Sequence, residues 1–321
     1  MTTKHAYLIL AHSNFKQLGF LIQLLDHERN DIFIHIDQKT VFDSKDEEQL
    51  RKYVRLSSIY FVPRVGVYWG GVSQIIAEMN LFKIAAQTDH YAFYHLLSGV
   101  DLPLSSQEDI HLFFDQHADK NFLTIMAHDR TPEDVNRIKY YHFFESFTPR
   151  TIPGLVGKAL FRIYRALEVW IQKLLRVDRI NKFNLTLVKA SQWVSLPSQT
   201  VSVILQEEDW LKRVFKHSFL CDELFIPMVL EKNGLLDQIY FAEVNNDQKD
   251  EFQGSLHFNN WWDGKPYTWQ SNQTDFAQLQ AAKSAGYLFA RKFAIENDEM
   301  MKEFIIQLIQ NEEQVDDNEE V

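Results

Sequence analysis

The sequence is poor in cysteine and glycine and has no long apolar run, and each shortage excludes a class of protein. Its single cysteine, Cys221, cannot form an internal disulfide, which excludes a disulfide-stapled scaffold and suits a reducing compartment. No window reaches the roughly 18 consecutive apolar residues of a membrane-spanning helix. The first residues lack the pattern of a secretory signal peptide. We therefore expect a cytoplasmic protein.

Motifs for common cofactors are also missing. Neither Gly-x-Gly-x-x-Gly nor Gly-x-x-x-x-Gly-Lys occurs among the 11 glycines, which argues against a dinucleotide fold or a phosphate-binding loop. There is no His-Glu-x-x-His and no Cys/His cluster at zinc-ligand spacing. Asp-x-Asp, with which many sugar-nucleotide enzymes hold a divalent metal, is absent from the folded region. Any diphosphate is therefore expected to be bound by cationic side chains.

Positive charge is scarce except in one segment. The chain has 33 Lys and Arg against 44 Asp and Glu, a formal net charge of −11, which disfavours nucleic acid as a partner. Residues 149–179 reverse this sign, and their apolar residues, including Trp170, recur at helical spacing. This basic amphipathic helix, above all residues 155–177, either lies on an anionic membrane surface or packs its apolar stripe on the main domain. Both alternatives stay open.

The remaining pattern alternates strands with helices. Apolar runs at 5–12, 31–37, 57–63, 91–98 and 121–128 predict strands, and helical periodicity follows several of them, as at 70–87. This alternation predicts an α/β fold with a central, mainly parallel sheet flanked by helices. We expect one domain over residues 1–294, with the basic helical insertion at 149–179, followed by an acidic helix and tail at 295–321. Ligands of such sheets bind beyond the carboxyl ends of the strands.

Two adjacent acids, Asp222 and Glu223, head an apolar run, where an ionised carboxylate is costly unless it is paired. Asp222 is predicted to cap a helix, which places Glu223 in the first turn, where the helix dipole favours the ionised form. Glu223 is then either a surface residue or a catalytic base. Neighbouring Cys221 is better explained as a small buried residue than as a nucleophile.

Seven stretches in register resemble one family. They are AYLILAHSNFKQLGFLIQLLD with DIFIHID, RVGVYWGGVSQIIAEMNLF, YHLLSGVDLPL, KASQWVSL, CDELF, NNWWDGKPYTW and LFARKF. In this order they resemble the Core-2/I-branching glycosyltransferases, which include branching N-acetylglucosaminyltransferases and peptide O-xylosyltransferases, here of a bacterial type. The resemblance implies a GT-A-type nucleotide-sugar fold, a UDP-sugar donor, an inverting mechanism, no cofactor and no divalent metal.

The same resemblance implies roles for individual residues. Glu223 matches the catalytic base, and Lys292 matches the lysine that binds the diphosphate. The family's second diphosphate-binding cation, an arginine, has no counterpart here, and Lys265 is one candidate to replace it. For two of these positions a structural explanation stays open beside donor binding. Asp101 is then a plain turn aspartate, and the Trp69-Gly70 turn is then only the entry to a helix. The expected donor-binding residues are Ala11, His12, Asp37, Trp69, Gly70, Asp101, Lys265, Arg291 and Lys292, and the expected acceptor-binding residues are Arg137, Lys139, Tyr140 and Trp193.

Together these expectations describe an inverting, metal-independent transferase. It would move GlcNAc, or next xylose, from a UDP-sugar to a hydroxyl of a glycan or lipid-linked acceptor in bacterial surface polysaccharide synthesis. It would act in the cytoplasm, at the inner face of the membrane if the basic helix binds there. Two alternatives are a non-catalytic family member that binds UDP-sugar or glycan, and a glycosidase with paired carboxylates.

Overall fold

The computed structural model describes residues 4–127, 132–146, 151, 154–263 and 266–310. Its central sheet has the strand order β3-β2-β1-β4-β8. The first four strands in that order are parallel, and β8 runs antiparallel to β4. A parallel sheet is buried on both faces, which explains why its strands read as continuous apolar runs. The strands are β1 (Lys4–Ala11), β2 (Asn30–Ile36), β3 (Ser58–Phe61), β4 (Tyr91–Ser98) and β8 (Ser195–Pro197).

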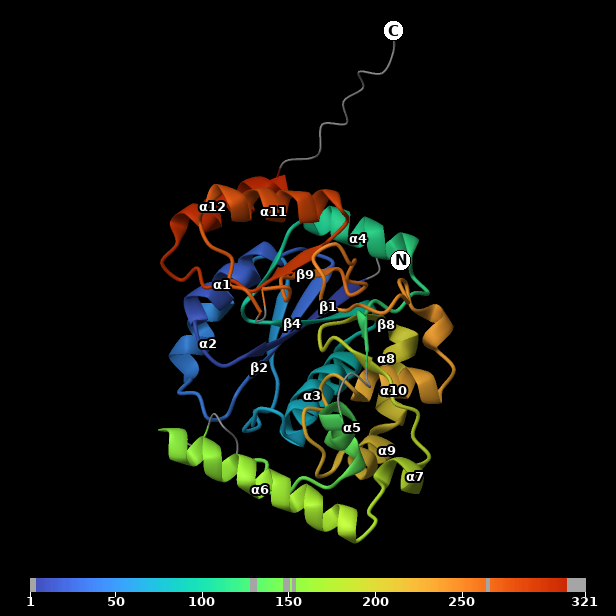
Figure 1. Cartoon of the computed structure of the whole chain (residues 1–321). Helices are drawn as coiled ribbons and strands as arrows, with labels where there is room; N and C mark the ends of the chain where they lie inside the picture. Colours follow the sequence, from blue (N-terminus) through green and yellow to red (C-terminus); the bar gives the residue numbers. More distant parts are fainter. Residues whose placement is uncertain (1–3, 128–131, 147–150, 152–153, 264–265, 311–321) are drawn as a thin grey trace.

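Helices cover both faces of this sheet (Figure 1), and each face has its own apolar core. In β1, Tyr7 and Ile9 pack into one core and Ala6 and Leu8 into the other, as the period of a strand requires. The first core includes α1 (Phe15–Leu24), α2 (Ser44–Arg51), α4 (Gln107–Gln116), α11 (Gln273–Ser284) and α12 (Glu299–Gln310). The second includes α3 (Val72–Thr88), α8 (Ser198–Gln206), α9 (Glu208–Phe215) and α10 (Phe225–Lys232).

Two smaller sheets bring distant segments together. In the three-stranded sheet, β10 (Phe289–Arg291) lies between β5 (Asp101–Pro103) and β9 (His257–Asn259), antiparallel to the former and parallel to the latter. In the other, β6 (Ile125–Met126) pairs with β7 (Lys189–Ala190). The connecting elements are the short helices α5 (Pro132–Lys139) and α7 (Arg179–Phe183) and the 3-10 turn η1 (Leu236–Gln238). Residues 289–291 thus lie against residues 101–103, and residues 189–190 against residues 125–126.

The strand predicted at 121–128 is the main error in the element pattern. Only Ile125–Met126 forms a strand, while Asn121 and Phe122 make single bridges to Ile239 and Ser195. Because β8 already pairs with β4 at this edge of the central sheet, Phe122 meets the sheet only through its single bridge to Ser195 of β8. The helix predicted near the end is α12, with Met301, Ile305 and Leu308 buried, and residues 311–321 lie outside the described part.

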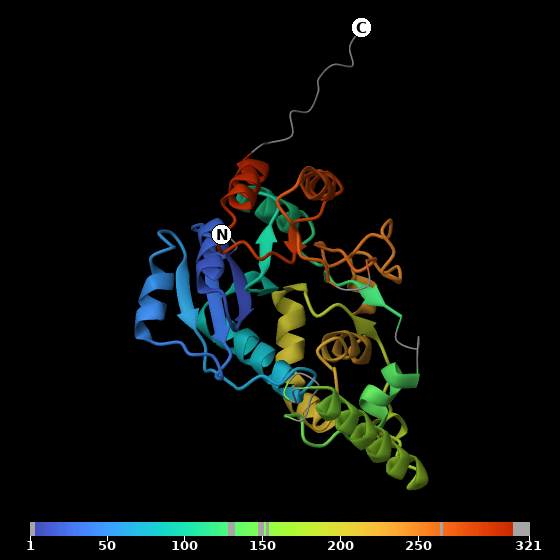
Figure 2. The same ribbon diagram turned by 60° about the vertical axis from the view of Figure 1, so that its left-hand side comes forward.

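The basic insertion forms one long helix, α6 (Gly154–Leu174), along the outer edge of the molecule (Figures 1 and 2). Its apolar stripe does not pack on the main domain, because Leu155, Ile163 and Trp170 are 85%, 64% and 59% exposed. The packing alternative is therefore wrong for most of this stripe. Within the described residues, no helix combines the length and the apolar character that crossing a membrane requires.

Candidate active site

Glu223 lies just before α10, next to two cationic side chains. Its backbone carbonyl accepts the N–H of Ala190 at 2.9 Å, so β7 fixes its position. Its Oε2 accepts a hydrogen bond from Arg137 Nη1 at 2.9 Å and lies 3.3 Å from Lys189 Nζ. Because the side chain is still 31% exposed, the carboxylate is oriented by two cations and remains reachable from solvent.

The predicted helix cap at Asp222 is wrong. Helix α10 begins at Phe225, and its N-cap residue, Leu224, makes no side-chain cap. Because the helix starts later, Asp222 turns inward instead: its Oδ2 accepts from Gln74 Nε2 at 3.1 Å, and its enclosed Oδ1 has no partner in the described part of the chain. Burial, helped by the charge of Glu223, raises the pKa of Asp222 to about 6.

A second enclosed acid, Glu78 of α3, lies behind this pair. Its Oε1 accepts from Gln192 Nε2 at 2.7 Å, while its buried Oε2 has no partner among the described residues. Burial, with a smaller contribution from the charge of Asp222, raises the pKa of Glu78 well above its ordinary value. The interior behind Glu223 therefore favours protonated acids, whereas Glu223 itself faces two cations.

Replacing Asp222 by Asn is expected to flatten the pH dependence of stability. The folded-state pKa of about 6 exceeds the ordinary 3.8. Protonated Asp222 therefore makes its full contribution to the free energy of unfolding below about pH 4. This contribution is lost as the pH rises through about 6. Removing this titration should shrink the change in unfolding free energy between pH 4 and 7 by up to about 3 kcal/mol. Urea denaturation at both pH values measures it.

Asp209→Asn, at an exposed position of α9, is the matched control and should keep the wild-type pH profile. An Asp222→Asn protein that also keeps that profile would show that the carboxyl of Asp222 has the same pKa in the folded and unfolded states.

The Trp69-Gly70 turn joins α3 to the segment before Glu223. Gly70 has a positive φ of 76°, and a Cβ built there would lie 2.7 Å from the ring of Phe219. The Leu220 N–H donates to the Gly70 carbonyl at 2.8 Å, and half-buried Trp69 meets the ring of Phe219 edge-on. Glycine is therefore required by this packing, whether or not a ligand also approaches the turn.

Asp101 and Arg291 are bound to each other across the β5–β10 pair. Asp101 is fully buried and accepts from Ser98 Oγ at 2.7 Å and Arg291 Nη1 at 2.9 Å. The guanidinium group of Arg291 also lies 4.2 Å from the ring centroid of Trp193, which is itself buried. This geometry favours the alternative for Asp101, a turn aspartate held by its neighbours, over a direct donor contact.

The residues expected around the uridine lie together at the ends of β1 and β2. The Asp37 N–H donates to the Ala11 carbonyl at 3.0 Å, and the exposed His12 follows Ala11. Asp37 Oδ1 accepts from the N–H groups of Lys39 and Val67 at 2.9 and 3.2 Å. One carboxylate oxygen of Asp37 therefore orders the surrounding loops, and the parallel register places all three predicted residues at one sheet edge.

Lys292 follows β10 and is half-buried. Its backbone is fixed by an N–H to the Tyr267 carbonyl at 3.3 Å and by a carbonyl that accepts from Trp269 at 3.0 Å. In the part of the chain that the structure describes, its ammonium group has no hydrogen bond or ion pair. The predicted Lys265 lies outside the described residues.

Of the four predicted acceptor residues, Arg137 alone is shown in contact with Glu223, and it also lies 3.1 Å from Asp134. The Lys139 ammonium pairs instead with Asp178 at 3.2 Å. Tyr140 and Trp193 are buried, with 5% and 8% of their surface exposed, so neither offers a face to a sugar in this conformation.

Sequence reasoning missed Lys189 and Gln74, which hold Glu223 and Asp222. Lys189 is the single charge in the apolar stretch 185–190, a signal that could have nominated it, and its side chain is only 11% exposed. Gln74 had no such signal. Its amide bridges the Gly70 N–H, at 2.6 Å, and the Asp222 carboxylate.

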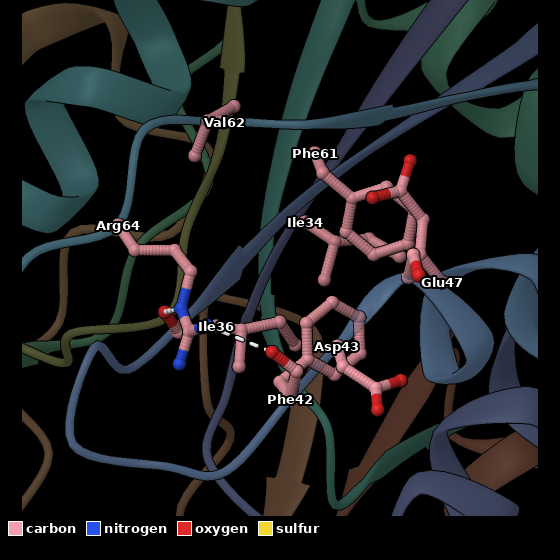
Figure 3. Close-up of a pocket in the computed structure, with 9 residues that line it drawn as sticks. Ile34, Ile36, Phe42, Asp43, Glu47, Phe61, Val62 and Arg64 are labelled. Carbon is pink, nitrogen blue, oxygen red and sulfur yellow. Dashed lines mark hydrogen bonds between the residues drawn. The ribbon is translucent and has the colours of Figure 1, made fainter.

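A hollow of about 260 Å³ lies elsewhere, between β2, β3 and α2 (Figure 3). Its polar groups are already used: Asp43 caps α2, Glu47 pairs with Arg51, and Arg64 donates to backbone carbonyls. It includes none of the predicted site residues. The residues that line it are Ile34, Ile36, Phe42, Asp43, Ser44, Glu47, Phe61, Val62 and Arg64.

Comparison with known proteins connects this geometry to a family. The family model of the Core-2/I-branching enzyme matches residues 5–282. Xylosyltransferase 2 of Rattus norvegicus is 22% identical over 300 residues, covering 90% of this chain and 32% of the relative. Xylosyltransferase of Ciona intestinalis is 20% identical over 298 residues, covering 89% and 32%. The chain thus spans about a third of the length of these curated relatives.

Two solved structures resemble the fold distantly. Mouse xyloside xylosyltransferase 1, in its apo form, aligns with a TM-score of 0.34 at 10% identity over 73% of this chain and 83% of that chain. Core-mannan synthase A from Aspergillus fumigatus, in a Mn/GDP form, aligns with a TM-score of 0.34 at 9% identity over 70% and 69%.

The manganese in the second structure corrects one prediction. A reaction without divalent metal was expected, but this mannan synthase was solved with manganese and GDP, so that prediction is withdrawn. Among the described residues, no group of three or more His, Cys, Asp or Glu side chains is placed to hold a metal ion. The absence of such a group among these residues is not evidence for a reaction without divalent metal.

The predicted α/β fold with a mainly parallel, helix-flanked sheet is confirmed. Six of the seven stretches that suggested the family lie within the residues that its model matches, and LFARKF, at 288–293, lies beyond them. The chain therefore belongs to the Core-2/I-branching enzyme family of glycosyltransferases.

Proposed function

We propose that this protein is an inverting glycosyltransferase that moves a sugar from a UDP-sugar to a hydroxyl of a glycan or lipid-linked acceptor. The observation that supports it best is the carboxylate of Glu223, which two cations orient and which is still 31% exposed. A general base needs this combination of fixed direction and access to the acceptor proton.

In the proposed step, Glu223 takes the proton of the acceptor hydroxyl while that oxygen attacks the anomeric carbon of the donor sugar. The bond from this carbon to the UDP oxygen breaks, UDP leaves with the electron pair, and the configuration inverts. Arg137 and Lys189 hold the base in place. In the same proposed step, the ammonium group of Lys292 contacts the leaving diphosphate, where negative charge grows in the transition state.

The names of the relatives, rather than the geometry, support the choice of donor sugar. Because they are named xylosyltransferases, we add xylose to the GlcNAc expected from the motifs. We further propose a role in bacterial surface polysaccharide synthesis at the inner face of the membrane. Incubating the protein with UDP-xylose, UDP-GlcNAc, UDP-galactose and UDP-glucose, with a panel of acceptors, tests the transfer directly.

UDP is expected to raise the melting temperature, because a ligand that binds only the folded form stabilises it by mass action. Lys292→Ala should weaken UDP affinity about tenfold, which corresponds to about 1.4 kcal/mol of lost charge interaction. Its affinity for uridine, which lacks the diphosphate, should not change. Thermal shift titrations with manganese and with EDTA measure both effects and report the metal requirement.

Lys52→Ala, an exposed lysine of the α2 end, is the control for charge alone and should bind UDP like the wild type. Failure of every uridine nucleotide to shift the melting temperature, with or without manganese, would overturn the donor assignment.

A further inference from the structure

Helix α6 is attached to the protein by polar side chains. Gln172 accepts from the Tyr141 N–H and donates to the Tyr141 carbonyl, both at 2.7 Å. Buried Glu168 accepts from the Phe143 N–H at 2.8 Å and from Arg165 at 2.6 Å. Burial alone would raise the pKa of Glu168. Its hydrogen bonds, of which the one from His142 has the largest effect, instead lower this pKa to about 2. The helix is therefore anchored without using its apolar stripe.

That apolar stripe faces away from the protein. On a helical projection of about 100° per residue, four members of the stripe fall within about 60° of one another, namely Ile163, Leu167, Trp170 and Leu174. They lie on the side of the helix opposite Glu168 and Gln172. Monomeric soluble proteins rarely expose a contiguous apolar surface of this kind without a function. The large apolar side chains exposed along it are Leu155, Val156, Leu160, Ile163, Leu167, Trp170, Ile171, Leu174 and Leu175, between 42% and 85% exposed.

The neighbouring loop extends this apolar surface. Phe144 is 70% exposed and Phe143 is 43% exposed, and the ring of Phe144 lies 6.2 Å from that of Tyr164 on α6. Both views show α6 at the periphery of the molecule, with the central sheet on its inner side (Figures 1 and 2). The helix, about 31 Å long for 21 residues, can therefore lie flat on another surface.

The charges of α6 indicate which kind of surface it binds. Lys158, Arg162 and Lys173 are exposed. Arg162 and Lys173 fall on one flank of the apolar stripe, within about 20° of one another, and Lys158 lies about 40° further round the helix. The single acid of α6, Glu168, is buried, so the helix presents positive charge alone in a chain of net charge −11. Apolar side chains including a tryptophan, flanked by cations, match the boundary between acyl chains and anionic headgroups.

We propose that α6, together with Phe143 and Phe144, binds the surface of an anionic lipid bilayer. The apolar stripe enters the acyl boundary, and the basic flank contacts the headgroups. This inference deepens the proposed function by naming the surface at which a lipid-linked acceptor is met. It connects to the site through a short segment, since α6 bonds to residues 141 and 143 and Arg137 of the same segment holds Glu223.

Flotation of the full chain with vesicles tests the proposal. We expect the wild type to float with vesicles containing 30% phosphatidylglycerol and to stay unbound with pure phosphatidylcholine. Ile163→Gln/Leu167→Gln/Trp170→Gln should lower the partition coefficient at least tenfold. The matched control, Val41→Gln/Leu56→Gln/Leu112→Gln, changes three equally exposed apolar residues away from α6 and should bind like the wild type.

Three outcomes would overturn the proposal. They are no binding of the wild type to anionic vesicles, equal loss in both triple variants, and a concentration-dependent wild-type dimer that the α6 variant alone abolishes without any vesicle binding. Light scattering after size-exclusion chromatography detects the dimer. A UDP thermal shift on the same variants separates the two hypotheses, because failure of docking leaves the shift intact and failure of the donor assignment removes it in every variant.

Discussion

Glu223→Gln is expected to lower kcat by roughly 10²–10⁴, the usual contribution of a general base, while UDP affinity stays within twofold of the wild type. The amide has nearly the same shape and still accepts a hydrogen bond from Arg137, so the site keeps its geometry. What it loses is the ability to take the acceptor proton. Initial rates of UDP release at saturating donor and acceptor measure the change.

Glu299→Gln, a change of the same chemistry at a side chain that is 75% exposed on α12, should leave the rate unchanged. A fully active Glu223→Gln protein would refute the assignment of the base. A wild-type protein that binds UDP yet transfers sugar from none of the donors would instead favour a non-catalytic family member.

Arg291→Met is expected to lower the free energy of unfolding by about 3–5 kcal/mol, the cost of removing one partner of a buried ion pair. The change leaves Asp101, which is fully buried, without its cation, while Ser98 alone continues to bond it. It also removes the guanidinium group from the ring of Trp193. Urea denaturation at pH 7 measures the loss.

Adding Asp101→Asn to Arg291→Met should recover part of this stability, because the unpaired charge is then removed with its partner. Arg213→Met, at an exposed position of α9, should cost less than about 1 kcal/mol, as exposed charges usually do. A loss below that value for Arg291→Met itself would mean that the Asp101 carboxylate is solvated or protonated in the folded protein.

The local order of the fold could be read from the sequence, whereas the contacts of the site could not. The runs at 5–12, 31–37 and 91–98 are strands because both faces of a parallel sheet are buried and the apolar pattern is continuous. Glu223 and Arg137 are 86 residues apart in the chain, and no local pattern reports such a pair. The enclosure of Asp222 was missed because its partner, Gln74, lies 148 residues away in the chain.

The direction of the apolar stripe of α6 illustrates the same limit. Helical spacing predicts that a stripe exists but not which surroundings it faces. In this protein, buried Glu168 and Gln172 satisfy the backbone of residues 141 and 143 and so take the inner side. The polar face of an amphipathic helix is here the anchored one, which composition alone cannot indicate.

The position of β10 has a consequence for synthesis of the protein. Strand β10 closes the edge of β5, yet 185 residues separate Pro103 from the start of β10 at Phe289. A nascent chain on the ribosome therefore keeps that edge open, and Asp101 without its cation, until residues 289–291 have emerged. Such distant pairing slows folding and prolongs exposure of an unpaired strand. We therefore expect the active region to mature only after β10 has been synthesised.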